Sequence, residues 1–209
     1  MQQQSTHDTF LNSSFSGLDA HDYEPFRKGR LDVNLPVPNS DIRLFIFNPA
    51  DYPYLWVKYL EGLQRAYGRM GVSHILDMKE LRNPGSAAMG ILAIINGEIV
   101  AGLRFHPSQL KAKETYVYHE MQDGNQALLE QYLKEWLPEK MLEAKGLWLT
   151  TRHPARKRIL HTMVRSSVYG AALFGARYIP CTSPSNMTKV YVEVGMEEMK
   201  EIGCVAYPT

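Results

Sequence analysis

The last third of the chain alternates apolar runs with helical patterns, and this order restricts the possible folds more than any other feature. The apolar run 147–151 follows Gly146, and a second run, 178–182, follows the helical segment between them. Pro154 suits the first turn of that helix and Gly175 suits its end. A strand–helix–strand unit of this length makes a right-handed crossover between parallel strands. We therefore expect 147–151 and 178–182 to be adjacent, parallel and splayed at one end.

The first half of the chain has the pattern of an antiparallel sheet. Asn96-Gly97 lies between two apolar runs, and this dipeptide is the preferred turn of a two-residue hairpin. Both arms are almost entirely apolar, so we expect both faces of the hairpin to be covered. Further strands are expected at 42–47 and at 115–119, the latter as a third antiparallel strand.

Two more segments carry apolar residues at helical spacing. The stripes are Trp56, Leu60, Leu63, Tyr67 and Met70, and then Leu128, Leu129, Tyr132, Leu133 and Trp136. Pro53 suits the start of the first helix, and Pro138 interrupts the second. The predicted fold class is α/β (α+β): a mixed, mostly antiparallel central sheet with one parallel, splayed strand pair and helices on both faces.

Length and composition favour one folded domain. The chain has 209 residues, of which 44% are hydrophobic, enough for a sizeable core. Residues 1–40 are expected to form a flexible tail and an extended strap, because they are polar at first and then rich in charge and proline. Residues 41–209 are expected to form the single domain.

Charge, cysteine content and hydropathy bear on the class of protein. A formal net charge of +1 favours neither bulk nucleic-acid binding nor a strongly acidic partner. Two cysteines are too few for a disulfide scaffold or a zinc cluster. No apolar run approaches the length of a membrane span, and the N-terminus lacks a signal-peptide pattern. We expect a cytoplasmic protein without a metal or an integral membrane segment.

One local motif carries a family resemblance. The segment Tyr191-Val-Glu-Val-Gly195-Met196 resembles the helix-end motif of the GCN5-related N-acetyltransferase superfamily, which has a tyrosine, three residues, a glycine and a bulky apolar residue. The hairpin around Asn96 resembles the central strands of that superfamily. The resemblance extends over residues 41–205. It is closest to the branch of acyl-homoserine lactone synthases and long-chain N-acyl amino acid synthases, because Arg104 is followed closely by Pro107.

The resemblance implies a donor site between the two parallel strands. Acetyl-CoA-binding members have a glycine-containing loop there, but Arg152–Ile159 contains no glycine. A helix N-terminus with cations can still bind a phosphate, and a single pantetheine phosphate on acyl-carrier protein would fit it better than a pyrophosphate. The donor is therefore acyl-CoA or acyl-carrier protein. The implied donor-binding residues are Leu149, Thr150, Thr151, Arg152, Arg156, Lys157 and Arg158; Leu149 stands where the branch has a glutamate.

The resemblance also implies catalytic and acceptor-binding residues. Tyr191 would protonate the leaving thiolate, whose ordinary pKa is about 8.5; packing at a helix end is the alternative role. Glu120, His119 and His106 are candidate bases, with Glu120 taken as the catalytic one. Arg104 could bind a carboxylate bidentately, with His106 beside it in the acceptor site. The alternatives are a solvated strand end for Arg104 and a solvated face for the basic helix.

The resulting prediction is an N-acyltransferase. It would move an acyl group from a pantetheine thioester to an amine of a small molecule such as an amino acid. The alternative is a catalytically inactive binding or regulatory module with the same fold. The sequence has no GxSxG, HExxH, Walker or Rossmann motif, so it does not support a hydrolase, a metalloenzyme or a nucleotide-binding fold.

Overall fold

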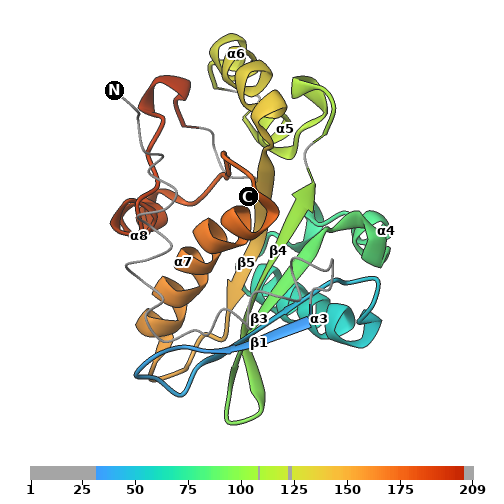
Figure 1. Cartoon of the computed structure of the whole chain (residues 1–209), viewed down its shortest axis with the longest axis vertical. Coiled ribbons are helices and arrows are strands. Elements are labelled where there is room, and N and C mark those ends of the chain that lie inside the picture. Colours follow the sequence, from blue (N-terminus) through green and yellow to red (C-terminus); the bar gives the residue numbers. More distant parts are fainter. Residues whose placement is uncertain (1–31, 108, 122–123, 205–209) are drawn as a thin grey trace, which may run out of the picture.

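Five strands form one antiparallel sheet in the computed structural model, which describes residues 32–107, 109–121 and 124–204 (Figure 1). The order across the sheet is β1-β2-β3-β4-β5, the same as along the chain. The strands are β1 Asp32–Pro36, β2 Arg43–Phe47, β3 Met89–Ile95, β4 Glu98–Pro107 and β5 Leu142–Leu149. Because each strand pairs with the one before it, β5 is the last strand at one edge.

Six α-helices and several short 3₁₀ turns are found in the described part of the chain. The helices are α3 Pro53–Arg69, α4 Met78–Leu81, α5 Tyr116–Glu120, α6 Gln126–Trp136, α7 Arg156–Phe174 and α8 Thr188–Glu193. The 3₁₀ turns are η2 Ser73–Ile75, η3 Pro84–Ser86, η4 Ala112–Glu114, η5 Leu137–Glu139, η6 Ser185–Met187 and η7 Lys200–Ile202. Within this part of the chain, no helix is long and apolar enough to cross a bilayer.

The predicted hairpin is confirmed in detail. Asn96 and Gly97 have positive φ angles of 50° and 81°, as a type I′ turn requires at both central residues. The arms are β3 and β4, which pair antiparallel from Ile95–Glu98 to Met89–Phe105. Most residues of both arms are buried, so this hairpin forms the middle of the sheet.

The two faces of the sheet are covered by different helices (Figure 1). Leu103 and Phe105 of β4 pack with Ile159 and Met163 of α7 in one core. The opposite core contains Trp56 and Leu63 of α3 together with Phe47, Leu92 and Trp148 of the sheet. Successive residues of β3 go to opposite cores, as Ile91 and Leu92 do, because side chains of a strand point alternately to the two faces. The predicted α/β class with helices on both faces is confirmed.

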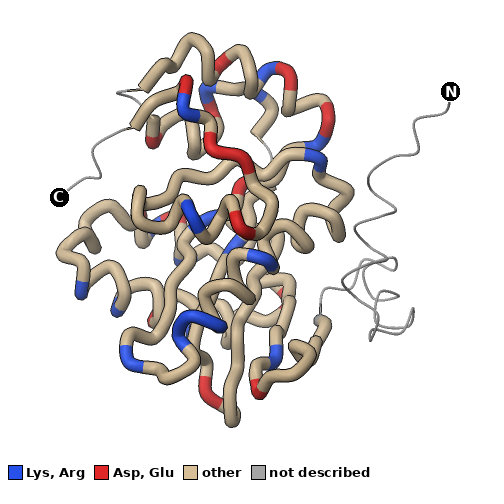
Figure 2. Tube along the Cα trace, turned by 90° about the vertical axis from the view of Figure 1, so that its left-hand side faces the viewer, with Lys and Arg blue, Asp and Glu red and all other residues tan. Residues whose placement is uncertain are grey.

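A third, smaller core lies beyond one end of β4 and β5 (Figure 1). Here α5, α6 and η7 pack around Val117, Leu133 and Ile202. The predicted helix around Leu128–Trp136 is confirmed as α6, and the predicted proline break is the turn η5. Basic and acidic residues are both spread along the trace (Figure 2), in keeping with the formal net charge of +1.

The prediction of a strand at 115–119 is wrong, because this segment forms helix α5. Thr115 caps the helix by accepting a hydrogen bond from the Tyr118 amide. The Glu143 carboxylate also accepts hydrogen bonds from the Tyr116 and Val117 amides, at 3.1 and 2.8 Å. A buried carboxylate from a distant strand thus satisfies the first N–H groups of a helix that residue propensity alone would not favour.

The predicted parallel strand pair is present in a reduced form. Its first strand starts earlier than expected, since β5 spans Leu142–Leu149 and Thr150 and Thr151 lie beyond it. The segment 178–182 is not a regular strand: it makes one parallel bridge, Met141–Tyr178. Pro180 has no N–H to donate, so a regular ladder cannot continue through it.

The sheet begins before the domain boundary that we expected at residue 41. Of the expected strap, Asp32–Pro36 is strand β1, which pairs along its length with β2. The tail expected at residues 1–20 lies outside the described residues. The backbone of β1 is therefore part of the sheet rather than a separate extended segment.

Candidate functional site

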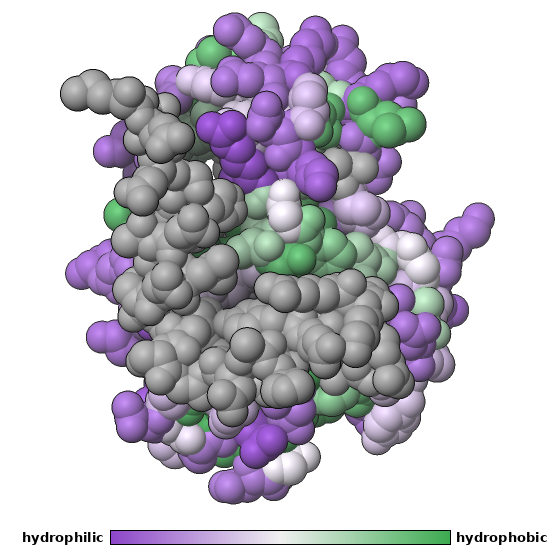
Figure 3. Space-filling model, viewed as in Figure 1, coloured by the Kyte–Doolittle hydropathy of each residue, from purple (hydrophilic) through white to green (hydrophobic). Residues whose placement is uncertain are grey.

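The edge of the sheet opens where β5 and the segment 178–182 separate. The Leu142 amide donates to the Tyr178 carbonyl at 3.0 Å, and the Arg177 amide donates to the Lys140 carbonyl at 2.8 Å. Beyond this point, the segment makes no further ladder pairing with β5 among the described residues. An apolar area lies at mid-height on this face of the molecule, beside the C-terminal end of α7 (Figure 3). Within the described part of the chain, no segment pairs with this edge of the later half of β5, so another extended chain can pair with it.

Helix α7 begins close to the end of β5. The Thr150 amide donates to the Val100 carbonyl, and the Arg156 guanidinium donates to the Thr150 carbonyl at 3.1 Å. No side chain caps α7 at Ala155. No described residue accepts a hydrogen bond from the Lys157 or Arg158 amide. The first turn of α7 therefore presents unused N–H groups, with the partial positive charge of a helix N-terminus, close to the open edge of β5.

Four exposed cations surround this helix start. They are Arg152, Arg156, Lys157 and Arg158. No described carboxylate lies within ion-pair distance of any of them, whereas other surface lysines, such as Lys134, are paired. Because no acidic residue in the described ranges pairs with these charges, they can bind a phosphate ligand without breaking an ion pair there.

Tyr191 lies on the short helix α8, which packs against α7. Burial raises the pKa of its hydroxyl above the ordinary value for tyrosine, and the neighbouring Cys181 thiol raises it further. Burial also raises the pKa of Cys181 to about 11. Both groups therefore carry their protons at neutral pH. The motif glycine, Gly195, follows the helix with a φ of 95°, and the Met196 amide donates to the Tyr191 carbonyl.

Glu120, at the end of α5, connects both sides of the opening. Its carboxylate accepts hydrogen bonds from the Lys145 ammonium of β5 and from the Thr182 hydroxyl. Lys145 is 8% exposed and Glu120 is 42% exposed. The charges of Glu120 and Lys145 also act on the Cys181 thiol. The Cys181 thiol therefore lies near both predicted catalytic residues: the Glu120 charge acts on it, and it in turn acts on Tyr191. His119, the other candidate base of this helix, makes no such link.

Arg104 is not the solvated strand end considered as its alternative role. It is 8% exposed on β4, facing α3. Its Nε donates to His106 Nε2 at 2.7 Å, and its Nη1 donates to the Tyr59 hydroxyl at 3.0 Å. No described carboxylate lies within ion-pair distance of it. The result is a buried positive charge whose side-chain hydrogen bonds go to the neutral groups of His106 and Tyr59.

His106 is unsuited to the role of a general base. Burial, and then the Arg104 charge, lower the pKa of its imidazole to about 3. Its Nε2 lone pair already accepts the Arg104 Nε–H, so it cannot take a proton from a substrate without breaking that bond. Its ring lies 4.5 Å from the ring of Tyr116, whose hydroxyl donates to Glu80. His106 therefore supports Arg104, and Tyr116 covers the pair.

Three residues of this site were missed by sequence reasoning. Glu143 is fully buried on β5, and burial raises the pKa of its carboxyl group. Lys145 lies two residues further on the same face, and Tyr59 comes from α3. The alternation of Leu142 and Ala144 with Glu143 and Lys145 was the available signal, because ionisable residues on a buried strand face are rare unless they are paired.

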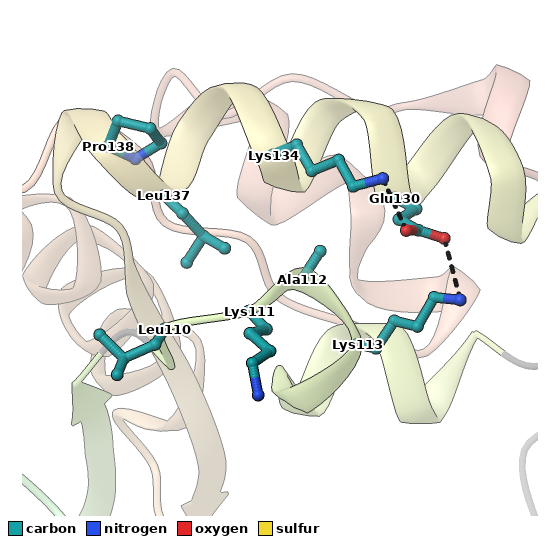
Figure 4. A pocket seen from close by; sticks show the side chains of 8 residues that line it. All are labelled: Leu110, Lys111, Ala112, Lys113, Glu130, Lys134, Leu137 and Pro138. Carbon is teal, nitrogen blue, oxygen red and sulfur yellow. Dashed lines mark ion pairs between the residues drawn. The ribbon is translucent and has the colours of Figure 1, made fainter.

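A separate groove lies among α6, η4 and η5 (Figure 4). Leu110, Ala112, Leu137 and Pro138 form its apolar part, and Lys113 and Lys134 both pair with Glu130 at its side. None of the predicted site residues lines it, and Lys113 and Lys134 share the one carboxylate of Glu130. The chemistry that the sequence predicts lies instead at the β5 edge. Among the described residues, no group of histidine, cysteine or acidic side chains is arranged to bind a metal ion.

Comparisons with known proteins agree with this architecture. No family model matches the chain. Uncharacterized proteins of Mycobacterium tuberculosis (strain H37Rv) and Mycobacterium bovis are 25% identical over 180 residues, which cover 85% of this chain and 68% of theirs. These relatives give no function.

Two solved structures resemble the chain over most of its length. One, an aminoglycoside acetyltransferase from an uncultured soil sample, has a TM-score of 0.51 and 16% identity, and the match covers 81% of this chain and 99% of that one. Another soil aminoglycoside acetyltransferase, in complex with trehalose, has a TM-score of 0.50 and 11% identity over 82% of this chain and 98% of its own. The chain therefore shares the fold of these two acetyltransferases, in agreement with the fold class expected from the sequence.

Proposed function

We propose that this protein is an N-acyltransferase that moves an acyl group from a pantetheine thioester to an amine of a small molecule. One observation carries the proposal: the later half of β5 has an open edge, and that edge leads to the uncapped N-terminus of α7. Pantetheine contains two amides and ends in a phosphate. An extended ligand of that kind can pair with a strand edge and place its phosphate at a helix start.

The cations around α7 bear on the choice of donor. Acyl-CoA carries a pyrophosphate and a further phosphate, whereas the pantetheine of acyl-carrier protein carries one phosphate. Four exposed cations without an acidic partner match several negative charges better than one. We therefore place acyl-CoA first and acyl-carrier protein second. Leu149, Thr150 and Thr151 would line the pantetheine arm, and Arg152, Arg156, Lys157 and Arg158 would contact the phosphates.

The proposed chemistry uses the two residues that lie near Cys181. The acceptor amine attacks the thioester carbonyl carbon as Glu120 accepts one of its protons. The tetrahedral intermediate then collapses: the carbon–sulfur bond breaks, the new amide forms, and Tyr191 gives its proton to the leaving sulfur. Solvent returns a proton to Tyr191 and removes one from Glu120. The raised pKa of Tyr191 keeps its hydroxyl protonated for this step.

Arg104 suggests the class of acceptor. A buried guanidinium without an acidic partner costs free energy that a bound carboxylate would recover. The acceptor would then carry both a carboxylate and an amine, as an amino acid does. Such a substrate fits the finer resemblance to long-chain N-acyl amino acid synthases, which the aminoglycoside acetyltransferase structures do not support. His106 and Tyr59 would hold the guanidinium for this contact.

The test is transfer by the purified full chain. The protein is incubated with acetyl-CoA, with longer acyl-CoAs or with acyl-carrier protein, and with a panel of amino acids and other amines. The expected result is release of free thiol together with an equal amount of N-acylated product, measured by mass spectrometry. Donor binding without any product would favour the inactive regulatory module. Absence of both binding and product would contradict the proposal.

A further inference from the structure

Tyr59 connects three elements that meet at the site. It is fully buried on α3, with its ring stacked 5.0 Å from that of Trp56. Its hydroxyl donates to the Gly146 carbonyl of β5 at 2.9 Å and accepts from Arg104 Nη1 of β4 at 3.0 Å. A single hydroxyl therefore links the helix to the buried cation and to the edge strand.

Strand β5 is irregular at Gly146, whose carbonyl accepts the Tyr59 hydrogen bond. The pairing register between β4 and β5 shifts between Gly102 and Arg104, and Gly146 has a φ of 59° there. A Cβ atom at Gly146 would lie 2.4 Å from the Tyr59 hydroxyl and 2.6 Å from Arg104 Nη1. Only glycine fits both this backbone conformation and this close approach.

The Gly146 carbonyl sets the direction of the next amide. In a regular ladder, a strand carbonyl points to a neighbouring strand, but this one bonds to a helix side chain. Because the peptide unit is planar and trans, the Leu147 N–H points away from that carbonyl. Tyr59 therefore fixes the peptide unit at which the open half of β5 begins.

We propose that Tyr59 is a positioning residue that aligns both substrates of the reaction. Its hydroxyl holds Arg104 for the carboxylate of the acceptor and holds the Gly146–Leu147 peptide for the thioester donor. This inference rests on the proposed function. The α7 end of the donor site lies outside this network, so phosphate binding does not depend on Tyr59.

The test compares Tyr59→Phe with the control variant Tyr132→Phe. The hydroxyl of Tyr132 donates an exposed hydrogen bond to Glu201, beside the smaller core. Kinetics are measured with an amino acid and with its carboxamide. For the amino acid, Tyr59→Phe should raise the KM and lower kcat, each by about 10- to 100-fold, because small misplacements have such effects. The KM for the carboxamide should stay within about twofold of wild type. The Kd for CoA should rise in Tyr59→Phe, because the pantetheine of CoA pairs with the peptide that Tyr59 holds. Tyr132→Phe should behave like wild type.

A purely structural role would instead lower kcat equally for both acceptors and leave both KM values unchanged, which would overturn the proposal. Amide hydrogen exchange at 147–149 in the free protein gives a readout that needs no turnover. Exchange there should be at least ~10-fold faster in Tyr59→Phe and unchanged in Tyr132→Phe. If wild type transfers no acyl group, the proposed function fails; if exchange is unchanged, the role of Tyr59 fails.

Discussion

At the scale of single residues, the account depends on where protons are held. The hydroxyl of Tyr191 is partly buried near Cys181, and its raised pKa keeps it protonated. Glu120 is 42% exposed and forms an ion pair with Lys145, so its carboxylate is accessible from solvent at the opening. One residue is thus suited to donate a proton and the other to accept one, which is the pair of roles that aminolysis of a thioester needs.

Replacing Tyr191 by phenylalanine should remove the proton donor and keep the ring. We expect kcat to fall at least ~10-fold while the donor Kd and the melting temperature stay close to wild type, because general acid catalysis typically contributes more than this. Steady-state kinetics and thermal unfolding on the same preparation measure both effects. Full activity in Tyr191→Phe would show that the tyrosine only packs.

Replacing Glu120 by glutamine should remove the base and half of an ion pair. We expect a large loss of kcat and a stability loss of about 1 kcal/mol, because Glu120 is 42% exposed and its pairing with Lys145 is partly screened. Denaturant unfolding measures the second effect. Glu193→Gln is a suitable control, since Glu193 contacts His161 and Lys189 at the surface. Wild-type kcat in Glu120→Gln would assign the base role to another group.

His106 should make the folded protein less stable in acid. Its pKa is lowered to about 3 in the folded state from 6.5, so the unfolded chain binds its proton first as the pH falls. Stability should therefore decrease below pH 6.5, by up to about 1.4 kcal/mol per pH unit. The carboxyl group of Glu143 has a raised pKa, so its titration makes the folded protein more stable as the pH falls. This contribution is the same in wild type and in a variant that changes only His106.

The variant His106→Gln isolates this effect, because glutamine does not titrate and can still accept the Arg104 Nε–H. Unfolding free energies measured at pH 7, 6 and 5 should fall less steeply in His106→Gln than in wild type. Parallel curves for the two proteins would mean that His106 is already protonated in the fold or is exposed to solvent.

At the scale of elements, α7 is the part whose role is most accessible to mutation. Arg156→Ala combined with Arg158→Ala should weaken CoA binding at least ~10-fold at low salt, because two charge-assisted phosphate contacts are lost. The matched control removes two exposed cations, Arg65 and Arg69, from α3 on the other face of the sheet. Neither pair should change stability by more than about 1 kcal/mol. Equal CoA affinity in the two double variants would remove α7 from the donor site.

The elements differ in how far their sequence predicts them. The hairpin at Asn96-Gly97 and the helices α3, α6 and α7 follow from local turn chemistry and apolar spacing. The segment 115–119 does not, because its β-branched and aromatic residues favour a strand, while the Glu143 carboxylate, from a strand far along the chain, caps it as a helix. A contact of that kind cannot be deduced from a local pattern.

The same distinction holds for the candidate site. Tyr191 could be proposed from its motif. Glu120 could be proposed because it follows a predicted strand, although that segment is the helix α5. The link from Tyr59 to Gly146 joins residues that are 87 positions apart, and nothing in either local sequence indicates it. The buried state of Arg104 likewise depends on α3, so its environment could not be predicted from β4 alone.

At the scale of the whole molecule, the proposed function assigns the two substrates to different sides of the sheet. One edge and the face with α7 provide an open strand, a free helix start and unpaired cations for a donor. The opposite face, between the sheet and α3 (Figure 1), holds the buried Arg104 network for an acceptor, and Tyr116 of α5 packs on His106 of that network. Lys145, Glu120 and Thr182 join these regions. The groove in Figure 4 lies outside this arrangement and has no role in it.

The most direct test of the central claim is the footprint of a donor on the full chain. Hydrogen exchange is measured with and without a non-reactive acyl-CoA analogue at about a hundredfold excess over its Kd, where binding stabilises the protein by about 2.7 kcal/mol. The account predicts strong protection of the amides at 147–151 and 155–158, and none in the α6 groove. Protection confined to that groove, or its absence from β5 and α7, would contradict the proposed donor site.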